Sequence, residues 1–248
     1  MENEYIFGDS NRLFLNTALG CSSACSYCYL PTLGYPISTN NIELKISAEH
    51  LFNLLKNDKR LIRGKSGTIL SIGCFSECWD SSNRSETINL LNMIFSLGNR
   101  VQLATKRELK NTDLLKLKTE SINLLYIFIS SATIQEWKNY EYATTNPMNR
   151  FKSFTVCKNL GIKAYLYIKP VIKNVTKKDL EAYKKIMTIY DVPVVVGDLF
   201  TMQGTDKPSP ISEKLYISSC MDNIYIYEEL IKYGDVYSNS TDVMKENT

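Results

Sequence analysis

Three cysteines near the start of the chain have the residue type and spacing that could hold a metal cluster. Cys21, Cys25 and Cys28 stand at Cys-x3-Cys-x2-Cys spacing, and an aromatic residue, Tyr27, precedes the last of them. A short loop can bring three thiolates to three corners of an iron–sulfur cube, and such clusters are held by cysteine thiolates, usually four. Three local ligands leave one iron without a protein ligand, and an open coordination position is where a metal site does chemistry.

Disulfide bonds and a zinc site are the alternatives for these cysteines. Zinc sites usually draw their cysteines as two separated pairs, which this spacing does not provide. The chain has seven cysteines, an odd number, and it starts with Met1-Glu2-Asn3-Glu4 rather than with the positive charges of a signal peptide. No apolar run reaches the roughly 18 residues of a spanning helix. We therefore expect a soluble cytoplasmic protein without a membrane partner, in a compartment where thiols stay reduced.

The cluster motif resembles the signature of the radical SAM enzymes, Cys-x3-Cys-x-aromatic-Cys, through Cys21, Cys25, Tyr27 and Cys28. The resemblance implies a [4Fe-4S] cluster whose fourth iron is chelated by the amino and carboxylate groups of S-adenosylmethionine (SAM). It implies that an electron from the cluster cleaves SAM to methionine and a 5′-deoxyadenosyl radical, which takes a hydrogen atom from a substrate or protein. It also implies an external one-electron donor of the flavodoxin or ferredoxin type. In such enzymes the cofactor supplies the hard chemistry and the protein positions it.

The elements that would position this loop alternate between strands and helices. Apolar runs predict strands over residues 12–18, 68–75, 101–106, 122–131, 163–172 and 193–200. Helical spacing of apolar residues predicts helices that begin at Ser47 and at Thr112 and that cover residues 85–97, 150–160 and 176–190. Ser47 and Thr176 are the expected N-caps, and Gly98 and Gly161 end their helices.

This alternation indicates βαβ units and a parallel sheet. Eight units would close a full barrel of about 250 residues. Six units before about residue 200 predict an α/β fold with an open, partial (β/α)6 TIM-like barrel and a C-terminal helical extension. We expect the barrel over residues 1–200 and the extension over residues 201–248, which comprises a linker at 203–212, a helix at 215–233 and a polar tail that frays from about Asp235.

A second candidate group follows the second predicted strand, at the end where α/β barrels place their active sites. Most radical SAM enzymes carry Gly-Gly-Glu here, whereas this chain has Gly73-Cys74-Phe75-Ser76-Glu77. The segment is similar to the Cys-Thr-Ser-Asp of spore photoproduct lyase and its relatives. Those enzymes also carry Cys-x-Tyr-Cys-Tyr-Leu at the cluster and Val-Thr-Lys at the end of the third strand, which residues 25–30 and 103–106 match or approach.

By this resemblance Cys74 would return a hydrogen atom to a product radical, and Tyr29 would relay the radical, assisted by Tyr27. A thiol S–H bond is weak enough for that role. The alternative is a structural cysteine, because cysteine is among the most commonly buried residue types. Strand alternation places Cys74 on the face of Ile72 rather than on the lumen face with Ser71, although parallel strands are apolar on both faces and alternation decides little.

Other strand ends supply candidates for binding SAM. Ser76 and Glu77 stand where the family holds the methionine amino group, and Tyr27 flanks the cluster. Lys106 shares a polar strand face with Gln102, and a buried lysine needs an anion. By family analogy that anion is the SAM carboxylate; the alternative is an ordinary surface lysine.

The later strands carry further candidates. Ser130 and Ser131 end the fourth strand, where the family often binds the SAM carboxylate or ribose, and the sequence leaves open which of them points inward. Asp198 ends the sixth strand and could reach an adenine, a ribose or a substrate donor. One face of the fifth strand carries residues that could meet a substrate or fill the lumen: Tyr165, Tyr167 and Lys169.

The substrate class stays open between a small molecule, a nucleotide, nucleic-acid repair of the photoproduct lyase type, and a peptide or protein. A net charge of +3 does not by itself indicate nucleic acid, and no aromatic-and-basic stripe is evident. A non-enzymatic rival is an iron–sulfur electron carrier or redox sensor, which predicts no SAM binding. Cys78, Cys157 and Cys220 could form a second cluster with Cys74 or be buried thiols, and their scattered spacing favours the latter.

Overall fold

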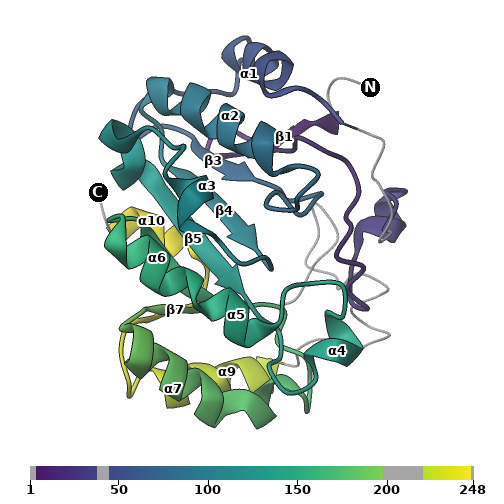
Figure 1. Ribbon diagram of the computed structural model, residues 1–248, viewed down its shortest axis with the longest axis vertical. Coiled ribbons are helices and arrows are strands. Elements are labelled where there is room, and N and C mark those ends of the chain that lie inside the picture. Colours follow the sequence, from purple (N-terminus) through teal and green to yellow (C-terminus); the bar gives the residue numbers. More distant parts are fainter. Residues whose placement is uncertain (1–3, 38–44, 198–219, 247–248) are drawn as a thin grey trace.

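The computed structural model describes residues 4–37, 45–197 and 220–246. Its strands form one eight-stranded sheet whose spatial order is the chain order (Figure 1). The strands are β1 (Ile6–Gly8), β2 (Arg12–Leu15), β3 (Ile69–Ile72), β4 (Val101–Thr105), β5 (Leu125–Ser130), β6 (Lys163–Ile168), β7 (Val194–Val196) and β8 (Val236–Tyr237). Strands β2 to β8 pair in parallel, and β1 is antiparallel to β2. The predicted α/β fold with a parallel sheet is confirmed.

The helices of the described residues are α1 (Ala48–Lys56), α2 (Arg84–Ile94), α3 (Asn111–Leu114), α4 (Trp137–Tyr140), α5 (Pro147–Phe151), α6 (Ser153–Asn159), α7 (Leu180–Tyr190), α9 (Cys220–Leu230) and α10 (Ser240–Glu246). Two predicted boundary signals are confirmed: the Ser47 hydroxyl accepts the His50 N–H at 3.2 Å, and Gly98 adopts a left-handed φ of 74°. The predicted cap Thr176 is wrong. Its hydroxyl accepts the Ile172 N–H and donates to the Ala132 carbonyl, so it braces a loop instead.

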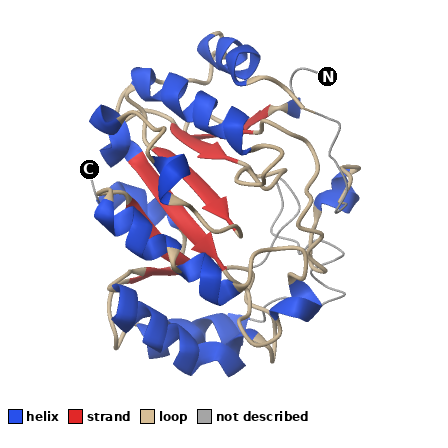
Figure 2. Cartoon of the chain, in the orientation of Figure 1, coloured by secondary structure: helices blue, strands red, loops and turns tan. Residues whose placement is uncertain are grey.

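The two faces of the sheet have different covers (Figure 2). On the outer face, alternate strand residues such as Leu13, Leu70 and Ile127 are fully buried in one large apolar core with the helices. Helices α7 and α9 pack against each other beside β7 and β8. The helix expected over residues 215–233 is therefore found as α9, while residues 215–219 and the expected linker lie outside the described residues. The division of the chain at residue 200 stays a prediction.

The inner face is closed at the beginning of the strands by α10. Val243 and Met244 of this helix are fully buried against Ile69, Tyr126 and Tyr165. The Arg100 guanidinium donates a hydrogen bond to the Met244 carbonyl, which ties α10 to the start of β4. The prediction of a frayed tail from Asp235 is thus wrong. Two apolar side chains in this mostly polar segment are enough to pack α10 against the sheet.

Candidate active site

The loop that carries the three cysteines begins directly after β2, at the carboxyl end of the strand. Backbone hydrogen bonds fix its two ends: Gly20 N–H donates to the Phe75 carbonyl at 2.9 Å, and Cys28 N–H donates to the Cys25 carbonyl at 3.0 Å. All three cysteines have free thiols, and each is buried or partly buried. The predicted ligand set is therefore gathered in one loop at the active-site end of the sheet.

Burial dominates the chemistry of these thiols when no metal is bound. It raises the pKa of Cys25 to about 12 and that of Cys28 to about 11, and the nearby positive charge of Lys106 partly offsets the effect. The pKa of Cys21 is raised as well, by burial and by the Glu77 carboxylate. Because metal ligands must be thiolates, loading the loop with a cluster would release protons.

Three free thiols in one loop are the donors that iron–sulfur clusters use. Within the described ranges, no group of three or more His, Cys, Asp or Glu side chains is close enough together to hold one metal ion. The buried hydroxyl of Ser23, inside the loop, has no hydrogen-bond partner among the described residues. Such an orphan marks a place where a bound group can supply the contact.

Cys74 and Tyr29, which the sequence pairs by resemblance alone, lie in contact. The Tyr29 hydroxyl is 3.1 Å from the Cys74 Sγ and also donates to the Cys74 carbonyl at 2.9 Å. Gly73 explains why strand alternation misplaces Cys74: β3 ends at Ile72, and the left-handed φ of 78° at Gly73 breaks the alternation. A Cβ at Gly73 would also come within 2.6 Å of the Cys78 Cβ, so this turn requires glycine.

The Glu77 carboxylate joins the loop after β3 to the end of β4. Its Oε1 accepts from the Thr105 hydroxyl at 2.6 Å and from the Trp79 N–H at 3.1 Å, and its Oε2 accepts the Lys106 N–H at 2.9 Å. The Ser76 hydroxyl accepts from the Asn83 amide at 3.4 Å. Ser76 and Glu77 face the cluster loop across a narrow cavity whose lining includes Ala18, Gly20, Ser22 and Asp80. Both predicted SAM-binding residues are therefore brought beside the cysteines.

Lys106 is mostly buried and faces a carboxylate that the sequence did not reveal. Its Nζ lies 4.0 Å from the Glu141 Oε1 and 5.7 Å from the centre of the Tyr27 ring. Burial lowers the pKa of Lys106, but the negative charges of Glu141, Cys25 and Glu77 together outweigh it, so the pKa is raised and the ammonium stays charged. The expectation that this lysine needs an anion is met within the protein itself.

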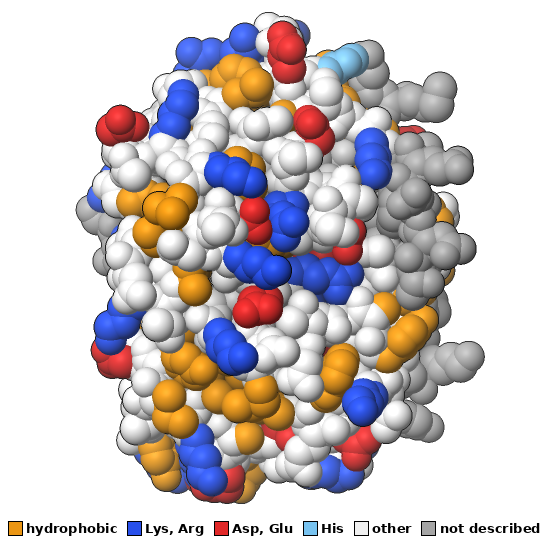
Figure 3. Space-filling view, viewed as in Figure 1, with side chains coloured by type: hydrophobic (Ala, Val, Ile, Leu, Met, Phe, Trp, Pro, Cys, Tyr) orange, Lys and Arg blue, Asp and Glu red, His pale blue; other side chains and the backbone are white. Residues whose placement is uncertain are grey.

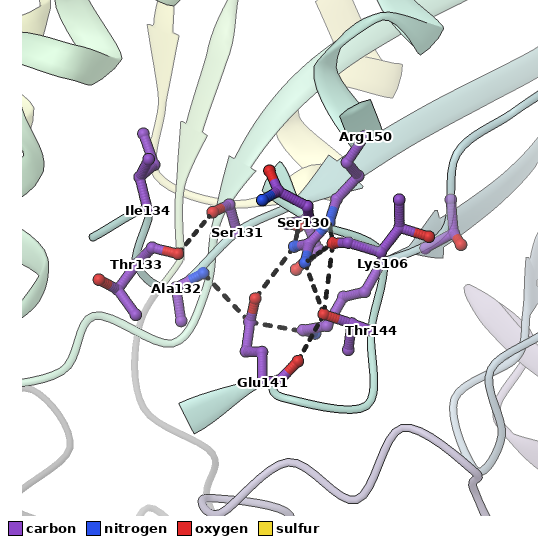
Figure 4. Close-up of polar contacts among 12 residues, drawn as sticks. Lys106, Ser130, Ser131, Ala132, Thr133, Ile134, Glu141, Thr144 and Arg150 are labelled. Atoms are coloured by element: carbon purple, nitrogen blue, oxygen red, sulfur yellow. Dashed lines mark hydrogen bonds and ion pairs between the residues drawn. The ribbon is translucent and has the colours of Figure 1, made fainter. Parts of the chain in front are cut away.

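Glu141 is the centre of a buried polar network (Figure 4). Its carboxylate accepts from the Tyr27 hydroxyl, from the Ala132 N–H at 3.2 Å and from Arg150 Nη1 at 3.0 Å. Arg150 in turn donates to the Thr144 hydroxyl at 2.7 Å. The Glu141 and Arg150 side chains are both 0% exposed. Lys106 and Arg150 thus share the Glu141 carboxylate.

This network escaped the sequence analysis because its members are distant in the chain. Tyr27 and Glu141 are 114 residues apart. The Tyr27 hydroxyl binds Glu141, whereas Tyr29 contacts Cys74, so the structure separates the two tyrosines that the resemblance groups as relays. The one available signal was an acidic residue nine positions before an arginine, after a predicted strand, and that pattern is too common to single out.

The two serines that end β5 point in different directions. Ser130 continues the inner face that Tyr126 and Phe128 occupy, and its hydroxyl donates to the Lys169 carbonyl at 3.4 Å. The Ser131 hydroxyl donates to the Thr133 carbonyl at 3.1 Å, and the Ser131 carbonyl accepts from Tyr183 of α7 at 3.2 Å. Ser130 is thus the serine that faces inward. Asp198 lies outside the described residues.

The remaining described cysteines belong to the packing. Cys157 in α6 is fully buried in the outer core, and burial raises its pKa to about 12. The Cys78 thiol is 3.7 Å from the Ala104 carbonyl, in the same core. They do not meet Cys74 in a metal-binding group among the described residues, and the side chain of Cys220 is not described.

Charges on the viewed surface are mixed rather than segregated. Basic side chains gather near the middle of the face in Figure 3, with acidic side chains between them. Several of the ion pairs are close, including Arg107 with Asp80 at 2.9 Å and Arg84 with Asp113 at 3.2 Å. Ser22 of the cluster loop also donates to Asp80 at 2.8 Å, so the Arg107–Asp80 pair braces that loop. Within the described ranges, no helix combines the length and the apolar character needed to cross a membrane.

Comparison with known structures identifies this fold. The chain matches Streptococcus suis SuiB bound to S-adenosylmethionine, with a TM-score of 0.64 and 14% identity over 95% of this chain and 51% of that one. It matches a spore photoproduct lyase variant with bound AdoMet and dinucleoside spore photoproduct, with a TM-score of 0.60 and 14% identity over 92% of this chain and 76% of that one. SuiB bound to its precursor peptide SuiA gives a TM-score of 0.62 at 13% identity, over 98% and 52% of the two chains.

These matches confirm the predicted fold, which the chain shares with SuiB and spore photoproduct lyase. The chain spans about half the length of SuiB. No family model matches the sequence, and no curated protein matches it either.

Proposed function

We propose that this chain is a radical SAM enzyme that binds a [4Fe-4S] cluster through Cys21, Cys25 and Cys28 and takes a hydrogen atom from an organic substrate. One observation carries the proposal: three free thiols in one loop lie beside a cysteine–tyrosine contact, at the carboxyl ends of β2 and β3. When bound, the cluster and SAM supply a 5′-deoxyadenosyl radical. The neighbours support the proposal because SuiB and spore photoproduct lyase bind SAM on the same fold.

The protein's own part is to bind and orient SAM. We assign the methionine amino group to Ser76 and Glu77, which line the cavity next to the cluster loop. We assign the carboxylate to Lys106, assisted by Ser130. Lys106 keeps its charge because Glu141 and the other negative groups near it outweigh burial. Glu141 is also paired with Arg150, so the Lys106 ammonium can pair with a second anion. Tyr27, held by Glu141, presents its ring to this lysine.

Cys74 and Tyr29 are placed to return a hydrogen atom. In this step the S–H bond of Cys74 breaks, a C–H bond forms at a substrate carbon radical, and the thiyl radical takes a hydrogen atom from the Tyr29 hydroxyl 3.1 Å away. One electron from the external donor and one proton then return the Tyr29 phenoxyl radical to the phenol. Burial raises the pKa of Cys74, which keeps the thiol protonated, and the charges of Arg12 and Lys169 only partly oppose this. A protonated thiol is the form that can donate hydrogen.

The substrate and the electron donor are part of the same proposal. Spore photoproduct lyase binds a dinucleoside spore photoproduct and SuiB binds a precursor peptide. The Cys74–Tyr29 contact favours chemistry of the first kind, in which a product radical is quenched by the protein. We propose an external one-electron donor of the flavodoxin or ferredoxin type and, because the described cysteines are free thiols, a cytoplasmic location.

Deuterium labelling tests the donor pair without knowledge of the substrate. SAM is cleaved anaerobically in D2O, where the exchangeable hydrogens of thiols and phenols become deuterium, and the 5′-deoxyadenosine is analysed by mass spectrometry. We expect wild-type protein to place one deuterium in part of the product, and Cys74→Ala and Tyr29→Phe to place less. Cys157→Ala is the matched control, since this thiol is buried in the outer core. Equal labelling in Cys74→Ala would remove Cys74 from the mechanism, and absence of 5′-deoxyadenosine from wild type would remove the proposed function.

A further inference from the structure

Arg12, the first residue of β2, projects onto the inner face of the sheet. Its Nε donates to the Ser71 hydroxyl of β3 at 2.7 Å, and its guanidinium carbon lies 4.4 Å from the centre of the Phe14 ring. When the Gln102 amide is oriented to satisfy its neighbours, its oxygen accepts from Arg12 Nε at 3.1 Å and also from Nη2. Neighbouring strands therefore hold the guanidinium flat and in one place, while the residue remains partly exposed.

No carboxylate compensates this charge within the described ranges. Arg12 takes part in none of the ion pairs there, and its Nη1 has no hydrogen-bond acceptor among the described residues. None of the eight strands contains Asp or Glu, although two of them contribute Arg12 and Lys163 to the inner face. Asp242 of α10 is engaged by Ser238 and Asn239 at the start of its own helix. A partly buried guanidinium without a counter-ion is costly unless an anion joins it.

The position of Arg12 relates it to the proposed hydrogen donor. Burial lowers the pKa of Arg12, and the Tyr167 and Cys74 groups oppose this effect electrostatically. The Phe14 and Tyr167 rings supply apolar surface on the same inner face. An anion at Arg12 would thus hold one end of a molecule whose other end approaches Cys74.

We infer that Arg12 is the anion-binding residue of the substrate site, so that the substrate of the proposed enzyme carries a phosphate or a carboxylate. Calling the bound anion a substrate rests on the proposed function. Binding of an anion at Arg12 requires neither the cluster nor SAM. Arginine suits the role because its planar guanidinium donates two parallel hydrogen bonds to either anion. Ser71 and Gln102 accept from Nε and Nη2 of Arg12, so its Nη1 can donate to an anion.

Binding of small aromatic anions tests the inference. Isothermal titration of the full chain uses phenyl phosphate, benzoate and the neutral benzyl alcohol as probes, with and without SAM. We expect one of the anions to bind at least about tenfold more tightly than benzyl alcohol, since a hydrogen bond to a charged group contributes that much. The preferred anion then distinguishes a phosphate-bearing from a carboxylate-bearing substrate.

Three variants make the result specific. Arg12→Gln should abolish the preference for the anion, Arg12→Lys should restore part of it, and Arg63→Gln, which alters an exposed arginine after α1, should leave it unchanged. Circular dichroism verifies that each variant is folded. Equal binding of anion and alcohol to wild type, or an anion preference that survives in Arg12→Gln, overturns the inference. So does a weaker affinity of Arg12→Gln for SAM itself, because Arg12 would then serve the cofactor. The proposed function is tested separately by the formation of 5′-deoxyadenosine.

Discussion

The two faces of the sheet differ in character: the outer face is apolar and the inner face carries polar side chains. On the outer face, Leu13, Leu103 and Leu166 are at most 1% exposed and belong to the large apolar core. The inner face, built from the residues between them, carries Arg12 and Gln102 together with serines, lysines and tyrosines. Because strand side chains alternate, one short segment can serve stability and chemistry at once. The comparison teaches that polar groups are concentrated on the face that the large helical core does not cover.

The inner face itself changes character along the strands. At their beginning, α10 seals it with Val243 and Met244, which meet other apolar side chains. At their carboxyl ends lie the cysteine loop, the Cys74–Tyr29 contact and the Glu141 network. A parallel sheet directs all of its strand ends to one edge, so residues far apart in the chain converge there. The following predictions test this division, in order of decreasing effect.

Loss of one cluster cysteine should have the largest effect. Cys28→Ala should retain little iron after anaerobic reconstitution and should form no 5′-deoxyadenosine, because two local thiolates cannot hold a cube. Cys157→Ala, in the outer core, should retain wild-type iron. Iron analysis of both proteins after desalting measures the difference. Equal iron in the two variants would mean that the loop is not the cluster site.

Breaking the buried ion pair should have the next largest effect. Glu141→Gln leaves Arg150 without its carboxylate, and both side chains are 0% exposed. Removal of one partner of such a pair typically lowers the free energy of unfolding by about 3–5 kcal/mol. Urea unfolding followed by circular dichroism measures this loss. Glu181→Gln is the control, because its pair with Lys184 is at the surface, with the Glu181 side chain 76% exposed. A loss no larger in Glu141→Gln than in the control would show that the network is not structurally important.

Disrupting the contact of α10 with the beginning of the strands should lower the free energy of unfolding by a smaller amount. Met244→Ala removes a fully buried side chain from the contact between α10 and the sheet. We expect the free energy of unfolding to fall by about 2 kcal/mol, at the low end for buried methionine. Met221→Ala in α9, where the residue is 74% exposed, should change it by less than about 0.5 kcal/mol. If both variants behave alike, α10 does not contribute to stability.

Lys106→Met should have the smallest effect of the four and should act on SAM rather than on folding. We expect the dissociation constant for SAM to rise about tenfold or more, since one charged hydrogen bond is lost. Lys116→Met, with a side chain that is 62% exposed, is the control. Equilibrium binding of SAM to the reconstituted proteins measures the change. Unaltered affinity in Lys106→Met would leave Glu141 as the only anion that this lysine serves.

The order of strands and helices was predictable because it rests on local patterns. All six predicted strands are present, although shorter than expected, since apolar residues continue past the last ladder hydrogen bond. β1 and α10 were not predictable: β1 spans three residues and α10 buries two apolar side chains. Such short segments are stabilised by contact with the folded sheet rather than by a local sequence pattern.

The candidate site was predictable where a motif is contiguous and unpredictable where it depends on tertiary contacts. The cysteine loop and the neighbouring Ser76 and Glu77 follow from spacing and resemblance. The orientation of Cys74 does not, because it depends on the left-handed turn at Gly73. Glu141 could not be linked to Tyr27 from sequence, since the contact joins two loops that only the folded sheet brings together.

The central claim, that the loop after β2 holds a cluster to which SAM binds, is tested most directly by electron paramagnetic resonance of the anaerobically reconstituted and reduced wild-type protein. The account predicts the signal of a reduced [4Fe-4S] cluster whose shape changes when SAM is added, together with 5′-deoxyadenosine in the same sample. A cluster signal that SAM leaves unchanged, with no 5′-deoxyadenosine formed, would contradict the account and indicate an iron–sulfur protein without SAM chemistry.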